Sequence, residues 1–498
     1  MPLTTITPEK AGISSRHVEA FLKRLDACGL ATHAVLLLRG NDIFCEAYWA
    51  PFHKDFCHRQ YSQTKSFVGV AVGLLVEDGL VDLDAPICRY FPEYDTPDLK
   101  PNLRKQTVRH MLTMQTCGGP PDWFKAADPD RTHLYMTENS ANLAPGLRWA
   151  YDSAGSQVLA TLVERVSGKS LFDFLNERIF CHLDAFHTAS ILKCRNEDSW
   201  GDSALLCTPR DMAAFARFVM NYGTWEGKRL MNEDYLREAT SPLASNDRMG
   251  FDSFETQGYG YQIWCLGKKG FFFNGMGSQL TFCYPEEDLI FVINSDNQGN
   301  ASAKALIYES FRSCILENLS DPLPEDSAAY ASLQSHCATL QLAVLKGHDP
   351  ERFAKESTAL QDKVWLCKPT ATGITQFSVH FNRDETGYLR YTNAQGEKIL
   401  PFGIGKNVFC KFPEEGYSFD RGGLRDTTGQ LYDCAVSAAW RGENRLELRV
   451  QIIDRYFGTA IFSVGFHGED AVLRMLKTAE DFLDTYNGAV PAKLQNAQ

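Results

Sequence analysis

One short stretch constrains this chain most: a serine and a lysine three residues apart, followed at once by a long apolar run. Ser62 and Lys65 precede residues 67–76, which read Phe-Val-Gly-Val-Ala-Val-Gly-Leu-Leu-Val. A helix that is apolar on nearly every side is a buried helix. If this helix begins near Ser62, Lys65 lies one turn along the same face. The stretch therefore predicts a buried helix with an amine beside a hydroxyl at its N-terminus.

Length, charge and cysteine usage limit the classes of protein that this chain can represent. Its 498 residues exceed one ordinary core, so we expect two or three domains. A net charge of -12 disfavours a nucleic-acid binder, which needs a basic face. The chain has no run of 18 apolar residues that would predict a membrane span, and its first residues lack the pattern of a secretory signal. Fifteen scattered cysteines without a Cys-x-x-Cys pair favour free thiols in a cytoplasmic protein.

The order of the predicted elements indicates an α+β fold for the first two thirds of the chain. A helix that Ser15 caps and Gly29 ends is expected first, then a hairpin, then the helix after Lys65, then several helices, then more strands and a last helix. Strands at both ends with helices between them imply one sheet assembled from distant segments and packed against the first and last helices. We predict strands at 34–38, 43–49, 259–266, 271–274, 279–284 and 289–294, and helices at 108–114, 156–166, 210–222 and 301–316.

The last third has a different pattern. An acidic, proline-containing stretch at 321–324 resembles a linker, and a helical segment near 330–345 follows it. Beyond that segment the chain consists mostly of short alternating runs separated by turns at hairpin spacing. We therefore predict one domain over residues 1–325, and a second over 326–498 that is an antiparallel barrel or sandwich, such as a lipocalin-like barrel, with a short helical lead-in.

The serine–lysine pair suits nucleophilic catalysis. A serine hydroxyl is a weak nucleophile until a neighbour takes its proton. A lysine can take it only if burial or nearby positive charge brings the amine toward neutrality, and the apolar helix beside Lys65 offers burial. The same four-residue spacing recurs at Ser190 and Lys193, but a polar segment, Cys-Arg-Asn-Glu-Asp, follows it. We therefore interpret that second pair as a solvated surface feature.

Residues 62–66, Ser-Gln-Thr-Lys-Ser, resemble the first motif of the serine β-lactamase and penicillin-binding-protein superfamily. The closest likeness is to the class C β-lactamase-like branch, which includes esterases and D-amino-acid peptidases. The likeness extends over roughly residues 5–320 and implies an α+β fold in which an antiparallel sheet is flanked by helices, with a helical subdomain. Other stretches similar to that branch are residues 79–84, 110–114, 208–212 and 258–261.

The second motif of that branch, Tyr-x-Asn after Pro-Gly and an aromatic residue, is similar to the stretch from Pro145 to Ser153. The resemblance implies that Tyr151 moves a proton between the nucleophile and the leaving group. Ser153 stands where the branch has asparagine, and its side chain lacks the amide donor that would bind a substrate amide. The resemblance therefore implies Ser62, Lys65 and Tyr151 as catalytic residues.

The third motif is commonly Lys-Thr-Gly or His-x-Gly on an edge strand, and its counterpart here is Gly275-Met276-Gly277-Ser278. The resemblance implies that the Ser278 N–H joins that of Ser62 in an oxyanion hole, or that of Gln279 if the register differs by one residue. Neither Gly275 nor Met276 supplies a partner for a substrate carboxylate, and charge-assisted bonds to such a group are strong. Glycines at this place would let a substrate lie against the strand.

These motifs together predict a metal-independent and cofactor-free serine hydrolase. Its expected substrate is an uncharged ester or amide, or a short peptide, cleaved through an acyl-enzyme. A β-lactamase or D-amino-acid peptidase is the alternative enzyme. A sensor that is acylated without turnover is the alternative outside catalysis.

Overall fold

The computed structural model describes residues 3–123, 126–247, 252–347, 350–414, 431–442, 444–478 and 487–495. The chain divides into two compact units, the first ending at Gln341 and the second beginning at Leu342. Helix α12 (Ser327–Cys337) packs against helix α1 (Ser15–Ala27), and its Leu333 joins the core of the first unit. The boundary between the two units therefore lies after α12, whereas the predicted boundary at residue 325 lies before it. The reason is that α12 buries its apolar face on α1.

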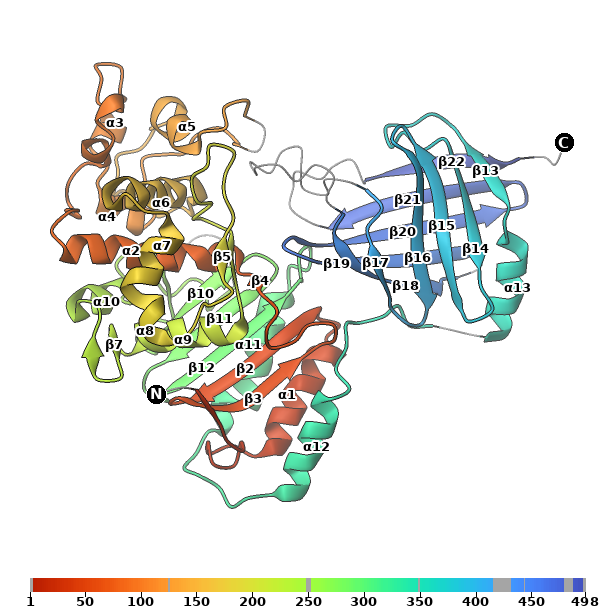
Figure 1. Cartoon of the computed structure of the whole chain (residues 1–498), viewed down its shortest axis with the longest axis horizontal. Helices are drawn as coiled ribbons and strands as arrows, with labels where there is room; N and C mark the ends of the chain where they lie inside the picture. Colours follow the sequence, from red (N-terminus) through yellow and green to blue (C-terminus); the bar gives the residue numbers. More distant parts are fainter. Residues whose placement is uncertain are drawn as a thin grey trace. The chain divides into compact units, whose positions relative to one another are not determined.

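A mixed seven-stranded sheet forms the centre of the first unit (Figure 1). Its strand β1 pairs in parallel with β3, and all other neighbours are antiparallel. The chain's first hairpin thereby lies beside strands that come some 250 residues later. In sheet order the strands are β1 (Thr4–Thr5), β3 (Asp42–Tyr48), β2 (Thr32–Arg39), β12 (Leu289–Ser295), β11 (Gln279–Tyr284), β10 (Phe271–Gly275) and β9 (Trp264–Cys265).

The strand predicted over 259–266 is wrong for most of its length. Only Trp264–Cys265 joins the sheet, as β9. The preceding residues bond elsewhere: the Tyr261 N–H donates to Ala239 O, and the Gln262 N–H donates to Leu112 O. Gln262 also has a φ of 59°, which a strand residue does not adopt. A turn that bonds to Ala239 and Leu112 therefore takes the place of most of the predicted strand, despite its aromatic and glycine-rich pattern.

Helices cover both faces of the sheet. On one face, α1 and α11 (Ala303–Cys314) pack together, and the rings of Phe291 and Phe311 stack with centroids 4.6 Å apart. On the other face, α9 (Pro209–Met220) packs on β2, β11 and β12. Thr208 and Asp211 start α9 with a capping box, in which each side chain bonds the other residue's backbone N–H.

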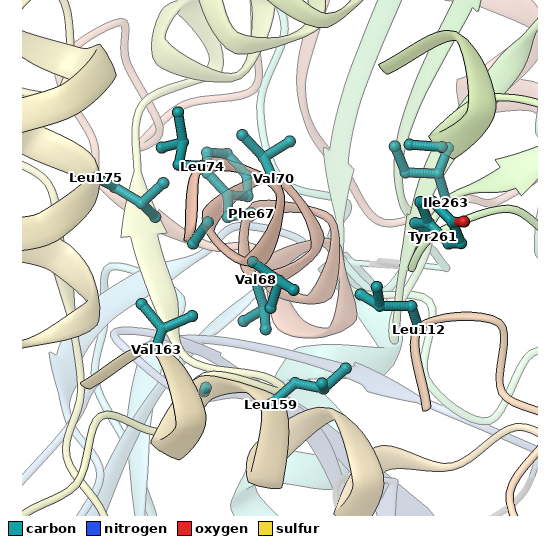
Figure 2. Packing of buried hydrophobic residues seen from close by; sticks show 14 of the residues in the cluster. Phe67, Val68, Val70, Leu74, Leu112, Leu159, Val163, Leu175, Tyr261 and Ile263 are labelled. Atoms are coloured by element: carbon teal, nitrogen blue, oxygen red, sulfur yellow. The ribbon is translucent and has the colours of Figure 1, made fainter. Parts of the chain in front are cut away.

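Helix α2 (Thr64–Glu77) is the buried helix that the sequence predicts, because every residue from Thr64 to Leu75 is buried. The ring of Phe67 stacks on Phe215 of α9 with centroids 3.6 Å apart. Figure 2 shows side chains projecting from different sides of α2 toward neighbouring elements, including Leu159 and Val163 of α6 (Ser153–Ser167). The helix is therefore enclosed on all sides, as its uninterrupted apolar run requires.

The remaining elements of the first unit surround α2 and carry loops around its N-terminus. A three-stranded sheet in the order β4, β6, β5 lies next to that end. These elements are the helices α3 (Pro101–Arg104), α4 (Val108–Leu112), α5 (Arg131–Glu138), α7 (Leu171–Leu175), α8 (Cys181–Leu183) and α10 (Glu233–Ala239), the strands β4 (His58–Arg59), β5 (Ser190–Ile191), β6 (Leu205–Cys207), β7 (Thr224–Trp225) and β8 (Lys228–Arg229), and the turns η1 (Tyr61–Gln63), η2 (Ile87–Tyr90), η3 (Pro92–Tyr94), η4 (Asn176–Phe180) and η5 (Leu316–Asn318).

The second unit is a closed β-barrel, which confirms the predicted antiparallel β domain. Helix α13 (Pro350–Leu360) precedes ten strands, and a parallel pairing of β16 with β18 closes a ring of nine. Buried and partly exposed residues alternate along β14 and β15, as barrel strands with one interior face require. The strands are β13 (Val364–Cys367), β14 (Gln376–Phe381), β15 (Thr386–Asn393), β16 (Gly396–Ile404), β17 (Val408–Lys411), β18 (Asp433–Trp440), β19 (Arg445–Ile453), β20 (Phe457–His467), β21 (Asp470–Thr478) and β22 (Gly488–Leu494).

Candidate active site

Ser62 lies in the 3-10 turn η1 immediately before α2, and the helix itself begins two residues later than expected, at Thr64. Tyr61 holds this turn in an unusual conformation with a φ of 47°. Such a backbone costs about 1–3 kcal/mol, so its surroundings must stabilise it. The Thr64 hydroxyl donates to Tyr61 O at 2.6 Å, and the Arg59 guanidinium lies 4.5 Å from the buried Tyr61 ring. These contacts fix the turn and leave Ser62 half-buried.

Lys65 reaches back from the first turn of α2 toward Ser62. Its Nζ lies 3.0 Å from Ser62 Oγ and donates to the backbone oxygen of Asp202 at 2.7 Å. The residue is only 1% exposed. A hydroxyl within hydrogen-bonding reach of a buried amine is the arrangement that proton removal from serine needs.

Tyr151 lies in the loop before α6 and faces the same amine. Lys65 Nζ is 5.1 Å from the centroid of the Tyr151 ring, and that ring stacks on Trp264 of β9 at 5.7 Å. Ser153 is the first residue of α6, whose N-cap is Asp152. The structure thus brings Ser62, Lys65 and Tyr151 together, although 86 residues separate Lys65 from Tyr151 in the sequence.

Asp152 lies between the two residues of the second motif that the sequence analysis singles out. Its carboxylate accepts from the Gly155 N–H at 2.9 Å and from the Tyr135 hydroxyl at 3.3 Å. Burial raises the pKa of Asp152. Its capping role orients the start of α6, and with it Tyr151 and Ser153.

The third motif differs from the expectation, because only Gly275 lies on a strand. Strand β10 ends there, and Met276, Gly277 and Ser278 form the turn to β11. Gly277 and Ser278 have φ values of 74° and 68°. The Ser295 hydroxyl lies 2.8 Å from both the Gly277 and the Ser278 carbonyl oxygens, and so holds the turn in place.

Gly275 is required by the protein's own packing. A Cβ added at this residue would lie 2.4 Å from the carbonyl oxygen of Gln60, two residues before Ser62. The glycine pattern predicts close approach of a substrate, whereas the group that approaches Gly275 in the structure is the backbone just before η1. Strand β10 and the turn that carries Ser62 are therefore in direct contact.

A buried amide network, which the sequence analysis missed, joins the same two segments. The Gln60 side-chain oxygen accepts from Gln63 Nε2 at 3.0 Å and from Asn294 Nδ2 at 3.1 Å. Asn294 Nδ2 also lies 3.2 Å from the side-chain oxygen of Gln279, whose Nε2 donates to Met276 O at 3.1 Å. Gln60 and Gln63 lie more than 200 residues before Gln279 and Asn294, so no local pattern could reveal that their side chains meet.

A cleft of about 420 Å³ opens beside the turn after β10, a volume in the range of small-molecule sites. Lys304 is on its wall, where its Nζ lies 2.7 Å from Glu255 Oε1. Glu255 also accepts from Asn274 Nδ2 at 2.6 Å, which links the cleft to β10. The cleft is lined by Asp252, Glu255, Met276, Gly277, Ser278, Asn297, Gln298, Gly299, Asn300, Ala301 and Lys304.

The second serine–lysine pair has none of these surroundings. Ser190 begins the two-residue strand β5 and is exposed. The Lys193 side chain is 51% exposed and lies 3.9 Å from Glu197. Within the part of the chain that the structure describes, no group of three His, Cys, Asp or Glu side chains is placed to bind a metal ion, and no helix is long and apolar enough to cross a membrane.

A mainly antiparallel sheet covered by helices, with a serine–lysine pair at the N-terminus of the buried helix, defines the fold class of serine β-lactamases and penicillin-binding proteins. The chain belongs to the beta-lactamase family, whose model matches residues 16–310. Its relatives place it among the serine hydrolases in general.

Three comparisons illustrate this relationship. The 6-aminohexanoate-dimer hydrolase of Paenarthrobacter ureafaciens is 29% identical over 52% of this chain and 71% of its own length. Esterase EstB of Burkholderia gladioli is 31% identical over 24% of this chain and 35% of its own length. A penicillin-binding protein homologue from Caulobacter crescentus, 15% identical, has the same fold with a TM-score of 0.52 over 62% of this chain and 99% of its own.

Proposed function

We propose that this protein is a metal-independent serine hydrolase that cleaves an uncharged ester or amide through a covalent acyl-enzyme. The observation that carries the proposal is the 3.0 Å contact between Lys65 Nζ and Ser62 Oγ at a buried position. In this mechanism, Ser62 is the nucleophile, Lys65 and Tyr151 handle the protons, and the backbone N–H groups of Ser62 and Ser278 stabilise the oxyanion.

The reaction divides into two proton-balanced halves. In acylation, Ser62 Oγ attacks the carbonyl carbon while its proton passes to Lys65. Tyr151 delivers its own proton to the leaving alcohol or amine as the scissile bond breaks, and the Lys65 ammonium then reprotonates Tyr151. In deacylation, a water molecule attacks the ester carbon and returns a proton to Ser62 as the acid leaves. Each oxyanion donor of this kind contributes about 10²–10³-fold in kcat in other hydrolases.

The side chains beside the turn after β10 support the proposed substrate class. Gly275 has no side chain to bind a carboxylate, and Lys304 in the adjacent cleft is already paired with Glu255 at 2.7 Å. These features favour a neutral acyl group. The names of two relatives, a dimer hydrolase and an esterase, agree with amide or ester cleavage.

A phosphonylating serine probe tests the nucleophile. After incubation with an alkyl fluorophosphonate, we expect peptide mass spectrometry to find the label on Ser62, and Ser62→Ala to lose both the label and esterase activity. Ser190→Ala is the matched control, because it alters the other serine of the same motif, and it should keep both. A label absent from Ser62, or full activity in Ser62→Ala, would refute the proposal. Activity should also survive prolonged treatment with EDTA.

A substrate panel separates the alternatives. Nitrophenyl esters, anilides, a D-alanyl peptide and a chromogenic β-lactam should be compared in neutral and carboxylate-bearing forms. We expect steady turnover, faster for the neutral member of each pair. Preference for the β-lactam or the D-alanyl peptide would support the alternative enzymes. Ser153 in place of asparagine, together with Gly275 in place of lysine or histidine, favours an acylated sensor, which would show one stoichiometric burst and no turnover.

A further inference from the structure

The groups around Lys65 include a buried charge pair that neither the motifs nor the proposed roles explain. Asp202 lies in the loop before β6, 137 residues from Lys65, and Arg131 is the first residue of α5. One carboxylate oxygen of Asp202 is 3.8 Å from Lys65 Nζ, and the other bonds Arg131 Nη1. The three side chains are only 2%, 6% and 3% exposed. The carboxylate therefore bridges two cations away from water.

We propose that Asp202 and Arg131 are positioning residues, which aim Lys65 at Ser62 and balance the charge around its amine. This inference rests on the proposed function of Ser62 and Lys65. It assigns a task to two residues outside the three motifs.

Charge balance explains why the pair needs both members. A carboxylate near a lysine favours the ammonium form, which cannot act as a base. Arg131 cannot lose its proton, so it compensates the charge of Asp202 whether or not Lys65 is protonated. When Lys65 is neutral, Asp202 and Arg131 sum to zero, and no buried charge is left without a partner. A buried charge without a partner would be strongly unfavourable.

The pair is held rigidly, as a positioning role requires. The Arg131 guanidinium carbon lies 3.6 Å from the centroid of the Trp123 ring. Gln157 of α6 ties the loop of Asp202 in place, because its amide donates to Ser199 O at 2.9 Å and accepts from the Gly201 N–H at 3.0 Å. The backbone oxygen of Asp202 is itself the 2.7 Å acceptor for Lys65 Nζ.

Other ionisable groups around this pair also bear on the charge of Lys65. Tyr151 presents its ring to Nζ, and the charge of Lys65 acts on Asp152, although burial raises the pKa of that carboxyl. Burial raises the pKa of Cys194, beside Arg131, to about 12, so its thiol stays neutral. Arg59 donates its Nε to the backbone oxygen of Ser203 at 3.1 Å. Among the ion pairs of the described residues, Asp202 therefore supplies the acidic group within 4 Å of Lys65 Nζ.

Opposite shifts in a pH profile test the inference. The rate of Ser62 labelling by an alkyl fluorophosphonate, and kcat/KM for 4-nitrophenyl acetate, should be measured from pH 5 to 10. Arg131→Met leaves Asp202 to hold the ammonium, so its profile should move up by about one pH unit. Asp202→Asn leaves Arg131 alone, so its profile should move down by a similar amount. The double variant should fall between the two.

Two further variants separate this role from a structural one. Arg131→Lys keeps the charge and should restore the midpoint of the profile even if the maximal rate falls. Arg217→Met removes another buried arginine, whose partner Asp288 lies away from the site, and should leave the midpoint unchanged.

Midpoints that stay at the wild-type value in both single variants, or that move in the same direction, would overturn the inference. If Arg131→Met does not fold, the downward shift in Asp202→Asn alone decides the question. Wild-type protein that is not labelled at Ser62 would instead refute the proposed function, so the two failures are distinguishable.

Discussion

Replacing Gly275 by alanine should uncouple the two halves of the proposed oxyanion hole. The new Cβ would lie 2.4 Å from Gln60 O, whereas real Cβ contacts are essentially never under 3.0 Å, so the two segments must separate by at least about 0.6 Å. Gln60 leads into the turn of Ser62, and Gly275 leads into the turn of Ser278. The separation therefore falls directly between the two backbone donors.

The expected size of the effect follows from that displacement. A misplacement of about 1 Å costs roughly 100-fold in rate, so about 0.6 Å should lower kcat/KM by about 10- to 100-fold. This equals about 1.4–2.7 kcal/mol of transition-state stabilisation. Overpacking should also reduce the free energy of unfolding by about 1–3 kcal/mol.

Steady-state hydrolysis of 4-nitrophenyl acetate, with urea unfolding of the same samples, measures both quantities. Gly119→Ala is the matched control, because a Cβ there meets nothing within 4 Å, and it should change neither by more than twofold or about 0.5 kcal/mol. If Gly275→Ala keeps kcat/KM within twofold of wild type while folded, the contact with Gln60 does not position Ser62.

Two further predictions concern stability. Burial lowers the pKa of His58, which lies 2.8 Å from a ring nitrogen of His33, to about 3 from its ordinary 6.5. The neutral ring therefore stabilises the fold above pH 6.5, and this contribution is lost as pH falls from 6.5 toward 3, by about 2 kcal/mol at pH 5. His58→Gln should remove that part of the difference between urea unfolding at pH 7 and at pH 5, and an unchanged difference would contradict the assignment. Phe67→Ala, which removes the ring stacked on Phe215, should lower the free energy of unfolding by about 3–5 kcal/mol. Leu80→Ala, at a 53% exposed site, should change the same free energy by less than about 0.5 kcal/mol. Equal losses in the two variants would contradict the burial argument.

Features set by neighbouring residues were predictable. The apolar run after Lys65 has no polar side, so a buried helix was its one stable solution, and the structure has it as α2. Strand β11 (Gln279–Tyr284) coincides with its prediction, because its short apolar run ends at the turn signal of residues 285–288. The alternation in the last third likewise predicted barrel strands.

Boundaries and exceptions were less accessible, because distant contacts decide them. Nothing local indicates that Ser62 lies in the turn η1 and not in α2, because contacts with distant residues hold this segment; the Gln60 N–H, for example, donates to Leu205 O at 2.8 Å. The residues before β9 look like a strand, but their backbone groups bond to α4 and α10. Helix α12 belongs with α1 for the same reason.

The sequence by itself pointed to the chemistry that we propose, through Ser62, Lys65 and Tyr151 and the order of their motifs. Only the tertiary structure decided which residues surround and orient these three side chains. Asp202 and Arg131 belong to no motif in the sequence. Folding removes their charges from water beside Lys65, and this gives them the positioning role that we propose. Gly275 is likewise one glycine among 37 until Gln60 packs against it. The physical reason is that catalytic groups follow local patterns, whereas their electrostatic and steric surroundings come from residues far away along the chain.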